Sequence, residues 1–137
     1  MNSMKNLFIL CLVVVCISCS PKLSPDVGWT RQRWVVTEMK GIPVQLSGGR
    51  RDAFIRFESD EKRFTGNGGC NQINGSYALD KKEIKFGQVV STKMSCEDIA
   101  FEGTFLDLLS KVDRYEQKGN DLYLKRKKEV ILVLSSR

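Results

Sequence analysis

Histidine is absent from the 137 residues of this chain. Its absence excludes a Ser-His-Asp triad, a Cys-His pair and an HExxH zinc site, because each of these needs an imidazole. The two cysteines beyond the N-terminal segment, Cys70 and Cys96, do not form a CxxC motif, which argues against oxidoreductase chemistry at a dithiol. The sequence contains neither internal repeats nor low-complexity segments, and its length fits one domain once a leader is removed.

No apolar run in the sequence is long enough for a transmembrane helix. The longest stretch near the N-terminus covers residues 7–17, and at about 1.5 Å per residue it spans roughly half of a bilayer core of about 30 Å. Lys5 precedes this run and supplies a positive charge. The combination is typical of a signal peptide.

The end of the apolar run indicates which kind of signal it is. Small Ser18 precedes Cys19, as in bacterial lipoprotein signals, although Cys16 stands where such signals usually have Leu or Val. Lipidation of Cys19 would anchor the protein without a spanning helix. We expect residues 1–18 to be the leader, 19–28 a tether and 29–137 the domain. The alternative is an ordinary secretory signal cut at the same bond.

Two further cysteines, Cys70 and Cys96, remain in the predicted domain. Thiols outside the cytoplasm tend to be oxidised, so the simplest prediction is a disulfide between them. Such a bond would close a loop of about 27 residues. Two buried reduced thiols and a pair of functional thiols are the alternatives.

Short β-prone segments with one helical interruption dominate the predicted domain. Ile55 and Phe57 alternate with Arg56 and Glu58, as in a half-buried strand. Apolar residues then recur at helical spacing, which predicts a helix over about 97–111. The fold is therefore expected to be mainly β, a small curled antiparallel sheet with one inserted helix. Its predicted core is bulky and leaves little room for a ligand: Trp34, Ile55, Phe57, Ile73, Leu79, Ile84, Phe86, Leu122, Leu124 and Leu132.

Three segments together resemble the META domain family, which includes HslJ-like heat-shock-associated proteins. They are GNGGCNQINGSYAL, IKFGQVVSTKMSC and the acidic amphipathic helix that follows. The resemblance covers about residues 29–135. Gly69, Cys70, Asn71 and Gly75 match the family's GCN…G motif, and Thr92, Met94 and Cys96 match its T-x-M-x-C motif.

The resemblance implies a lipocalin-like β-barrel with an inserted helix and with the two cysteines near each other. It also implies export or lipid anchoring and an association with envelope or drug stress. No enzymatic activity is generally assigned to the family. We therefore treat Gly69, Asn71, Gly75, Thr92 and Met94 as structural motif residues.

The expected function is that of a non-enzymatic envelope lipoprotein, a binding or structural module associated with envelope stress. The alternative is a lipocalin-like carrier of a small apolar ligand. We expect no catalytic residue, no metal site and no cofactor. The expected location is the outer membrane, facing the periplasm, with the membrane contacted through lipidated Cys19. The oligomeric state is not predicted.

The net charge of +6 includes a basic cluster at residues 125–128. In a cytoplasmic protein this charge would favour nucleic-acid binding, but the leader argues against that compartment. Possible partners are an envelope protein or an anionic polymer, which the cluster could contact near a membrane. The alternative for the cluster is an exposed hairpin turn that keeps a sheet edge soluble.

Overall fold

The computed structural model describes residue 28 and residues 32–49, 51–97 and 99–137. The predicted leader, Cys19 and most of the tether lie outside the described residues. No helix in the described part of the chain is both long enough and apolar enough to cross a membrane.

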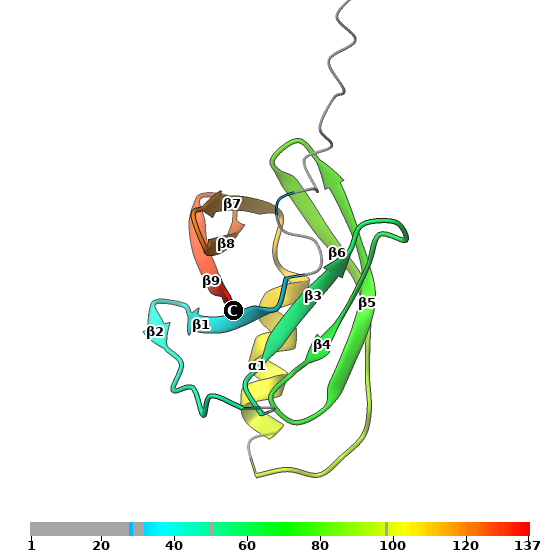
Figure 1. Cartoon of the computed structure of the whole chain (residues 1–137), viewed down its shortest axis with the longest axis vertical. Helices are drawn as coiled ribbons and strands as arrows, with labels where there is room; N and C mark the ends of the chain where they lie inside the picture. Colours follow the sequence, from blue (N-terminus) through cyan, green and yellow to red (C-terminus); the bar gives the residue numbers. More distant parts are fainter. Residues whose placement is uncertain (1–27, 29–31, 50, 98) are drawn as a thin grey trace, which may run out of the picture.

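Antiparallel strands make up most of the described chain, in agreement with the predicted mainly β fold (Figure 1). The strands are β1 (Trp34–Met39), β2 (Ile42–Pro43), β3 (Phe54–Glu58), β4 (Arg63–Asn67), β5 (Gln72–Asp80), β6 (Glu83–Ser91), β7 (Arg114–Lys118), β8 (Asp121–Arg126) and β9 (Glu129–Ser136). The helix α1 (Ile99–Ser110) follows β6. It is slightly shorter than the predicted span of 97–111.

The sheet curls until its ends meet. Strands β3 to β9 pair in chain order, and β1 pairs with β3 on one side and with β9 on the other. The short β2 adds only to the far end of β1. The predicted curled sheet is therefore a closed ring, because its first long strand hydrogen-bonds to its last.

Two seams of the ring are short, and the helix packs against strands on two sides of the ring. The β6–β7 seam has one paired position, Glu83 with Arg114, and the β1–β3 seam has two. Helix α1 packs against β6 and β9 (Figure 1). Its side chains Phe105, Leu108 and Leu109 are fully buried in the core. The helix thus contributes its apolar face to the core between β6 and β9.

The interior of the ring is packed with large side chains. Trp34, Phe57, Phe64 and Phe105 are each fully buried, and the rings of Phe64 and Phe86 meet edge to face at 5.4 Å. Burying an aromatic or aliphatic side chain of this size contributes about 1.5–3 kcal/mol. Of the predicted core residues, only Leu79 and Phe86 are partly rather than fully buried. The core therefore matches the bulky interior expected from the sequence.

Candidate functional site

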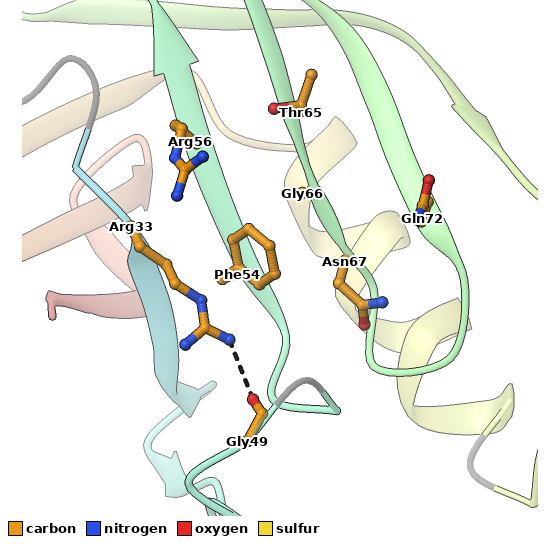
Figure 2. Close-up of a pocket in the computed structure, with 8 residues that line it drawn as sticks. All are labelled: Arg33, Gly49, Phe54, Arg56, Thr65, Gly66, Asn67 and Gln72. Carbon is orange, nitrogen blue, oxygen red and sulfur yellow. Dashed lines mark hydrogen bonds between the residues drawn. The ribbon is translucent and has the colours of Figure 1, made fainter.

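A first cleft opens on the outer face of β3, β4 and β5. It has a volume of about 660 Å³, and we call it the sheet-face cleft. Two arginines lie on one side of an aromatic ring, and polar side chains lie on the other (Figure 2). Its lining comprises Arg33, Gly49, Phe54, Arg56, Thr65, Gly66, Asn67 and Gln72.

Strand register places these side chains next to one another. Phe54 lies opposite Asn67, and Arg56 lies opposite Thr65, so their side chains share one face. The Arg33 guanidinium carbon lies 4.3 Å from the centre of the Phe54 ring. Its Nη2 also donates a hydrogen bond to the Gly49 carbonyl at 3.1 Å (Figure 2). Arg33 is thus held in place by a cation–π contact and a hydrogen bond.

A second cleft runs between the β1–β2 turn, the following loop and α1. It has a volume of about 700 Å³, and we call it the helix groove. Its walls are mainly apolar, with Met39, Ile42 and Leu46 facing Phe101 and Leu108 of the helix. Ile42 is 70% exposed, so part of this apolar surface is open to solvent.

Buried Asp52 fixes the loop that forms one wall of the helix groove. Its carboxylate accepts hydrogen bonds from the backbone N–H of Ser47 at 2.6 Å, the Ser47 hydroxyl at 2.8 Å and the Gly48 N–H at 2.9 Å. Burial alone would raise the pKa of Asp52, but these donors outweigh it and lower the pKa below its ordinary value. Asp52 therefore holds the loop in place through hydrogen bonds to its ionised carboxylate.

The segment between β4 and β5 borders both clefts. Asn67 and Gln72, at its two ends, line the sheet-face cleft, while Gly69 lines the helix groove. We call residues 67–72 the motif loop, because it contains the predicted family residues Gly69, Cys70 and Asn71. Its conformation sets the shape of both clefts.

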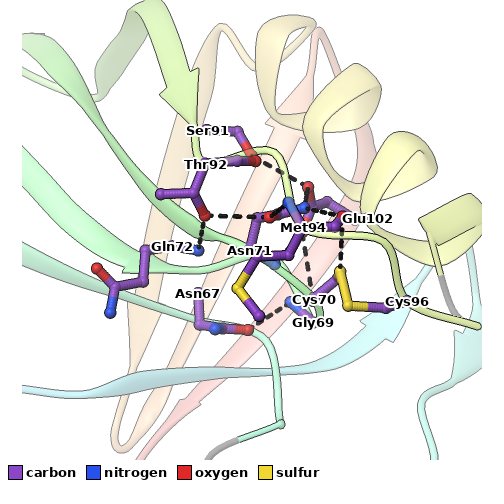
Figure 3. The surroundings of a disulfide bond; sticks show 10 residues. All are labelled: Asn67, Gly69, Cys70, Asn71, Gln72, Ser91, Thr92, Met94, Cys96 and Glu102. Carbon is purple, nitrogen blue, oxygen red and sulfur yellow. Dashed lines mark hydrogen bonds between the residues drawn. A yellow bond between two sulfur atoms is a disulfide. The ribbon is translucent and has the colours of Figure 1, made fainter.

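A disulfide joins the motif loop to the segment before the helix. Cys70 and Cys96 are bonded, with their Cα atoms 5.9 Å apart (Figure 3). The structure thus brings together the two cysteines that the sequence paired. The bond leaves neither sulfur available as a nucleophile or a metal ligand.

Glu102, on the first turn of α1, binds the motif loop from inside. Only 4% of it is exposed. Its carboxylate accepts from the backbone N–H of Asn71 at 2.6 Å, the Asn71 side-chain amide at 2.9 Å, the Ser91 hydroxyl at 3.1 Å and the backbone N–H of Cys70 at 3.3 Å (Figure 3). Burial raises the pKa of Glu102, but these donors more than offset that effect and hold the pKa below its usual value.

The side chain of Asn71 links the same network to the second family motif. Its Oδ1 accepts from the backbone N–H of Met94 at 2.6 Å and from the Thr92 hydroxyl at 3.0 Å. The Thr92 oxygen in turn accepts from the backbone N–H of Gln72 at 3.1 Å (Figure 3). Met94 contributes through its backbone, since the residue is 63% exposed. We call Glu102, Asn71, Ser91, Thr92 and the disulfide the motif hub.

Two glycines of the motif loop are required by the geometry of the hub. Gly69 has φ of +108°, a conformation that other residues rarely adopt. A Cβ on Gly68 would lie 2.6 Å from a carboxylate oxygen of Glu102. In the neighbouring strand, a Cβ on the predicted motif residue Gly75 would lie 2.8 Å from the Phe64 ring.

The two buried carboxylates of the described domain are suited to fixing the conformation of loops rather than to transferring protons. Both buried carboxylates, Asp52 and Glu102, are surrounded by hydrogen-bond donors and have lowered pKa values. A general acid or base working near neutral pH needs a pKa closer to that pH. Within the described residues, no group of three or more histidine, cysteine or acidic side chains is arranged to hold a metal ion.

The basic cluster at residues 125–128 lies at the hairpin turn between β8 and β9. Lys127 has φ of +57°, and its backbone N–H donates to the Asp113 carboxylate at 2.7 Å. Lys125 forms an ion pair with Glu116, which also pairs with Lys118. The cluster is therefore part of a hairpin turn, as the second of the two interpretations from the sequence predicted.

Sequence reasoning missed Glu102, the residue at the centre of the hub. Glu102, Phe105 and Leu109 are spaced three and four apart, so they lie on one face of the helix. This position could have been noticed from the sequence, because a carboxylate on the same helix face as buried apolar residues needs hydrogen-bond partners.

The comparisons with known proteins agree with this architecture. The family model of the META domain matches residues 28–137. A protein from Burkholderia xenovorans, solved by NMR, is 21% identical, with a TM-score of 0.65 over 80% of this chain and 83% of its own. A DUF4847 family protein from Bacteroides vulgatus, solved by crystallography, is 18% identical, with a TM-score of 0.60 over 79% of this chain and 93% of its own.

Those likenesses to solved structures concern the fold alone. Among curated proteins, none matches the chain. The family match covers the ring, the motif hub and both clefts, which is the whole described domain. The chain therefore belongs to the META domain family.

Proposed function

We propose that the protein is a non-enzymatic binding module of the cell envelope, anchored to a membrane through lipidated Cys19 and used under envelope stress. The observation that supports this function most directly is the fixed motif loop. The loop borders both clefts and is held by a disulfide and a buried carboxylate. A surface fixed before binding loses little conformational freedom when a ligand arrives.

The absence of enzymatic activity is inferred from the state of the reactive groups. The domain cysteines are joined, and the buried carboxylates have lowered pKa values with donors on their oxygens. The chain contains no histidine. Two hydroxyls do contact these carboxylates, Ser47 at Asp52 and Ser91 at Glu102. The lowered pKa values make both carboxylates weak bases, so we infer that these contacts support the shape of the clefts.

The anchor is tested by replacing the predicted lipidation site. Cys19→Ser should move the protein from the membrane fraction to the soluble fraction of its native cells. Cys11→Ser, a matched change within the leader, should leave the protein in the membrane fraction. Membrane retention of the Cys19→Ser variant would contradict the proposed anchor.

The binding role is tested by crosslinking the anchored protein in living cells and identifying the captured molecules by mass spectrometry. We expect an envelope protein or an anionic polymer that is captured more strongly under envelope stress. Variants that distort the motif loop, such as Gly69→Val, should reduce capture at equal protein level. Capture of cytosolic proteins alone would oppose the proposal.

A second candidate function, the carrier of a small apolar ligand, is favoured by the helix groove. Its volume of about 700 Å³ falls within the roughly 300–1,000 Å³ typical of small-molecule sites. N-phenyl-1-naphthylamine should then fluoresce on binding, and Thr104→Trp, which narrows the groove, should abolish the signal. Ser110→Trp, at an exposed position on the side of the same helix that faces away from the groove, is the control. An equal signal in both variants would oppose the carrier.

A further inference from the structure

We infer that the sheet-face cleft binds an acidic glycan, with a sugar carboxylate at Arg56 and Arg33 and sugar hydroxyls at Asn67, Thr65 and Gln72. This inference rests on the proposed binding function and gives it a site and a ligand class. It concerns a different surface from the basic cluster at residues 125–128.

The cleft offers two cations and no competing anion. Its lining contains Arg33 and Arg56 but neither Asp nor Glu. Within the part of the chain that the structure describes, the exposed Arg56 guanidinium makes neither a hydrogen bond nor an ion pair. Guanidinium groups bind carboxylates through two parallel hydrogen bonds, which makes an anionic ligand the natural partner.

Arg33 is the fixed member of this pair. Its guanidinium is stacked over Phe54 at 4.3 Å, and Nη2 is committed to the Gly49 carbonyl. The remaining N–H groups can donate to a ligand. Because the side chain is already ordered, less conformational entropy is lost when a carboxylate binds.

The opposite side of the cleft presents groups that match hydroxyls. The Oδ1 of Asn67 accepts from the backbone N–H of Gly69 at 2.7 Å, which leaves the NH₂ group of Asn67 to donate to a ligand. Thr65 and Gln72 are exposed neighbours of Asn67 and add a hydroxyl and a second amide. Amides and hydroxyls both donate and accept, as the hydroxyls of a sugar do.

An acidic peptide fits this surface less well. Extended peptides commonly add to an open sheet edge, but the polar residues of the cleft lie on a sheet face, and β4 is paired on both sides along its whole length. A nucleic acid also fits poorly, because base stacking needs an exposed aromatic face. Arg33 covers one face of Phe54, and no other aromatic residue lines the cleft.

The basic cluster supplies a matched control for charge. Arg126 at that turn is exposed, so Arg126→Gln removes the same charge as Arg56→Gln at a different place. If binding followed net charge alone, the two substitutions would have equal effects. If it depends on the cleft, only Arg56→Gln should weaken it.

The experiment uses the full-length protein purified in detergent from whole native cells, so that it does not depend on where the protein is found. Binding of tetragalacturonate is measured by calorimetry beside its neutral methyl ester, and poly-glutamate and a single-stranded DNA oligomer serve as other anions. We expect the acid to bind at least about tenfold more tightly than the ester and the other anions, since the ester keeps the hydroxyls but loses the charge-assisted contact.

Substitutions then locate the binding site. Arg56→Gln should weaken tetragalacturonate binding by about tenfold, and Arg126→Gln should change it by less than about twofold. Gln72→Ala should weaken it by about threefold through the loss of a hydroxyl contact. Each arginine variant should retain the unfolding midpoint of the parent. Within the described residues, the side chains of Arg56 and Arg126 form neither hydrogen bonds nor ion pairs that the substitution would remove.

Three results would overturn the inference: equal binding of acid and ester, tighter binding of poly-glutamate or DNA, or equal loss in the Arg56→Gln and Arg126→Gln variants. Failure of the proposed function is a separate result, because it is measured by where Cys19→Ser is found in cells. A glycan bound by an unanchored protein would support the cleft and refute the envelope role.

Discussion

Glu102 and Glu116 have the same side chain and both have lowered pKa values, but for different reasons. Glu102 is buried, and uncharged backbone and side-chain donors surround it. Glu116 lies on β7 between Lys118 and Lys125, whose hydrogen bonds lower its pKa to about 2. The buried carboxylate holds three segments together, whereas the exposed one joins neighbours in a hairpin. Two glutamates whose pKa values are both lowered are therefore expected to contribute very different amounts to the free energy of unfolding.

The largest effect is expected from removing the buried carboxylate. Glu102→Ala would leave the N–H donors of Asn71 and Cys70 without their acceptor and create a cavity. We expect a loss of about 3–5 kcal/mol in the free energy of unfolding, because each buried unsatisfied group costs roughly 1–3 kcal/mol. Urea unfolding of the oxidised protein measures this loss. A loss below about 1 kcal/mol would mean that water replaces the carboxylate without difficulty.

The disulfide should contribute the next largest amount. Cys70 and Cys96 are 26 positions apart, and for a loop of this length the chain-entropy model gives about 3.5 kcal/mol. The double variant Cys70→Ala/Cys96→Ala should therefore lose about 2–4 kcal/mol in urea unfolding. The parent protein in reductant should show a similar loss, and an unchanged midpoint in both would contradict the prediction.

The third test compares a glycine at which an added methyl group would meet the hub with one at which it would meet no atom. Gly68→Ala would place a methyl group against Glu102 and should cost about 1–3 kcal/mol through overpacking. Gly103→Ala, one residue further along the helix, meets no atom within 4 Å and should stabilise by about 0.5–1 kcal/mol. Thermal unfolding of both variants should show shifts of opposite sign.

Acid should weaken the domain through the buried carboxylates. The folded-state pKa of Glu102 lies below its ordinary value of 4.5, so its stabilising effect is complete above that value and is lost as the pH falls through the lower, folded-state pKa. Asp52 acts in the same direction. Urea midpoints measured from about pH 6 to pH 3 should fall more steeply in the parent than in Glu102→Gln. Parallel curves would show that Glu102 does not titrate differently on unfolding.

The smallest effect is expected at the exposed carboxylate. Glu116→Gln breaks ion pairs with Lys118 and Lys125 on the surface, where such pairs contribute little. We expect no measurable change in the urea midpoint. The pKa of Glu116, measured by NMR, should rise from about 2 towards its ordinary value in high salt. A large stability loss in this variant would remove the contrast with Glu102.

The sequence contains local information on the strands and helix but little on how they close. Alternation at Ile55 and Phe57 predicted β3, and helical spacing at Phe105 and Leu109 predicted α1 within two residues at each end. The family resemblance implied a closed barrel, but local patterns did not identify β1 and β9 as the strands that close it, because contact between strands so far apart in the chain leaves no local pattern. Phe64 was missed in the core, since it lies among the glycine-rich residues before the motif loop.

The candidate site, like the fold, could be predicted only in part from the sequence. The cysteines and the residues Gly69, Asn71 and Thr92 could be selected from the family motifs, and they meet in the hub. Glu102 and the sheet-face cleft could not be selected, because their roles depend on side chains brought together from several strands and the helix. Arg33 and Arg56, for example, are neighbours only through the β1–β3 seam.

The pairing of β1 with β9 also determines the order in which the protein can fold. The motif hub and its disulfide use residues 70–102, so they can assemble as soon as that middle part of the chain is available. The ring closes only when β9, the last strand in the chain, pairs with β1. Until that pairing forms, β1 keeps an unpaired edge at which the partly folded protein can aggregate.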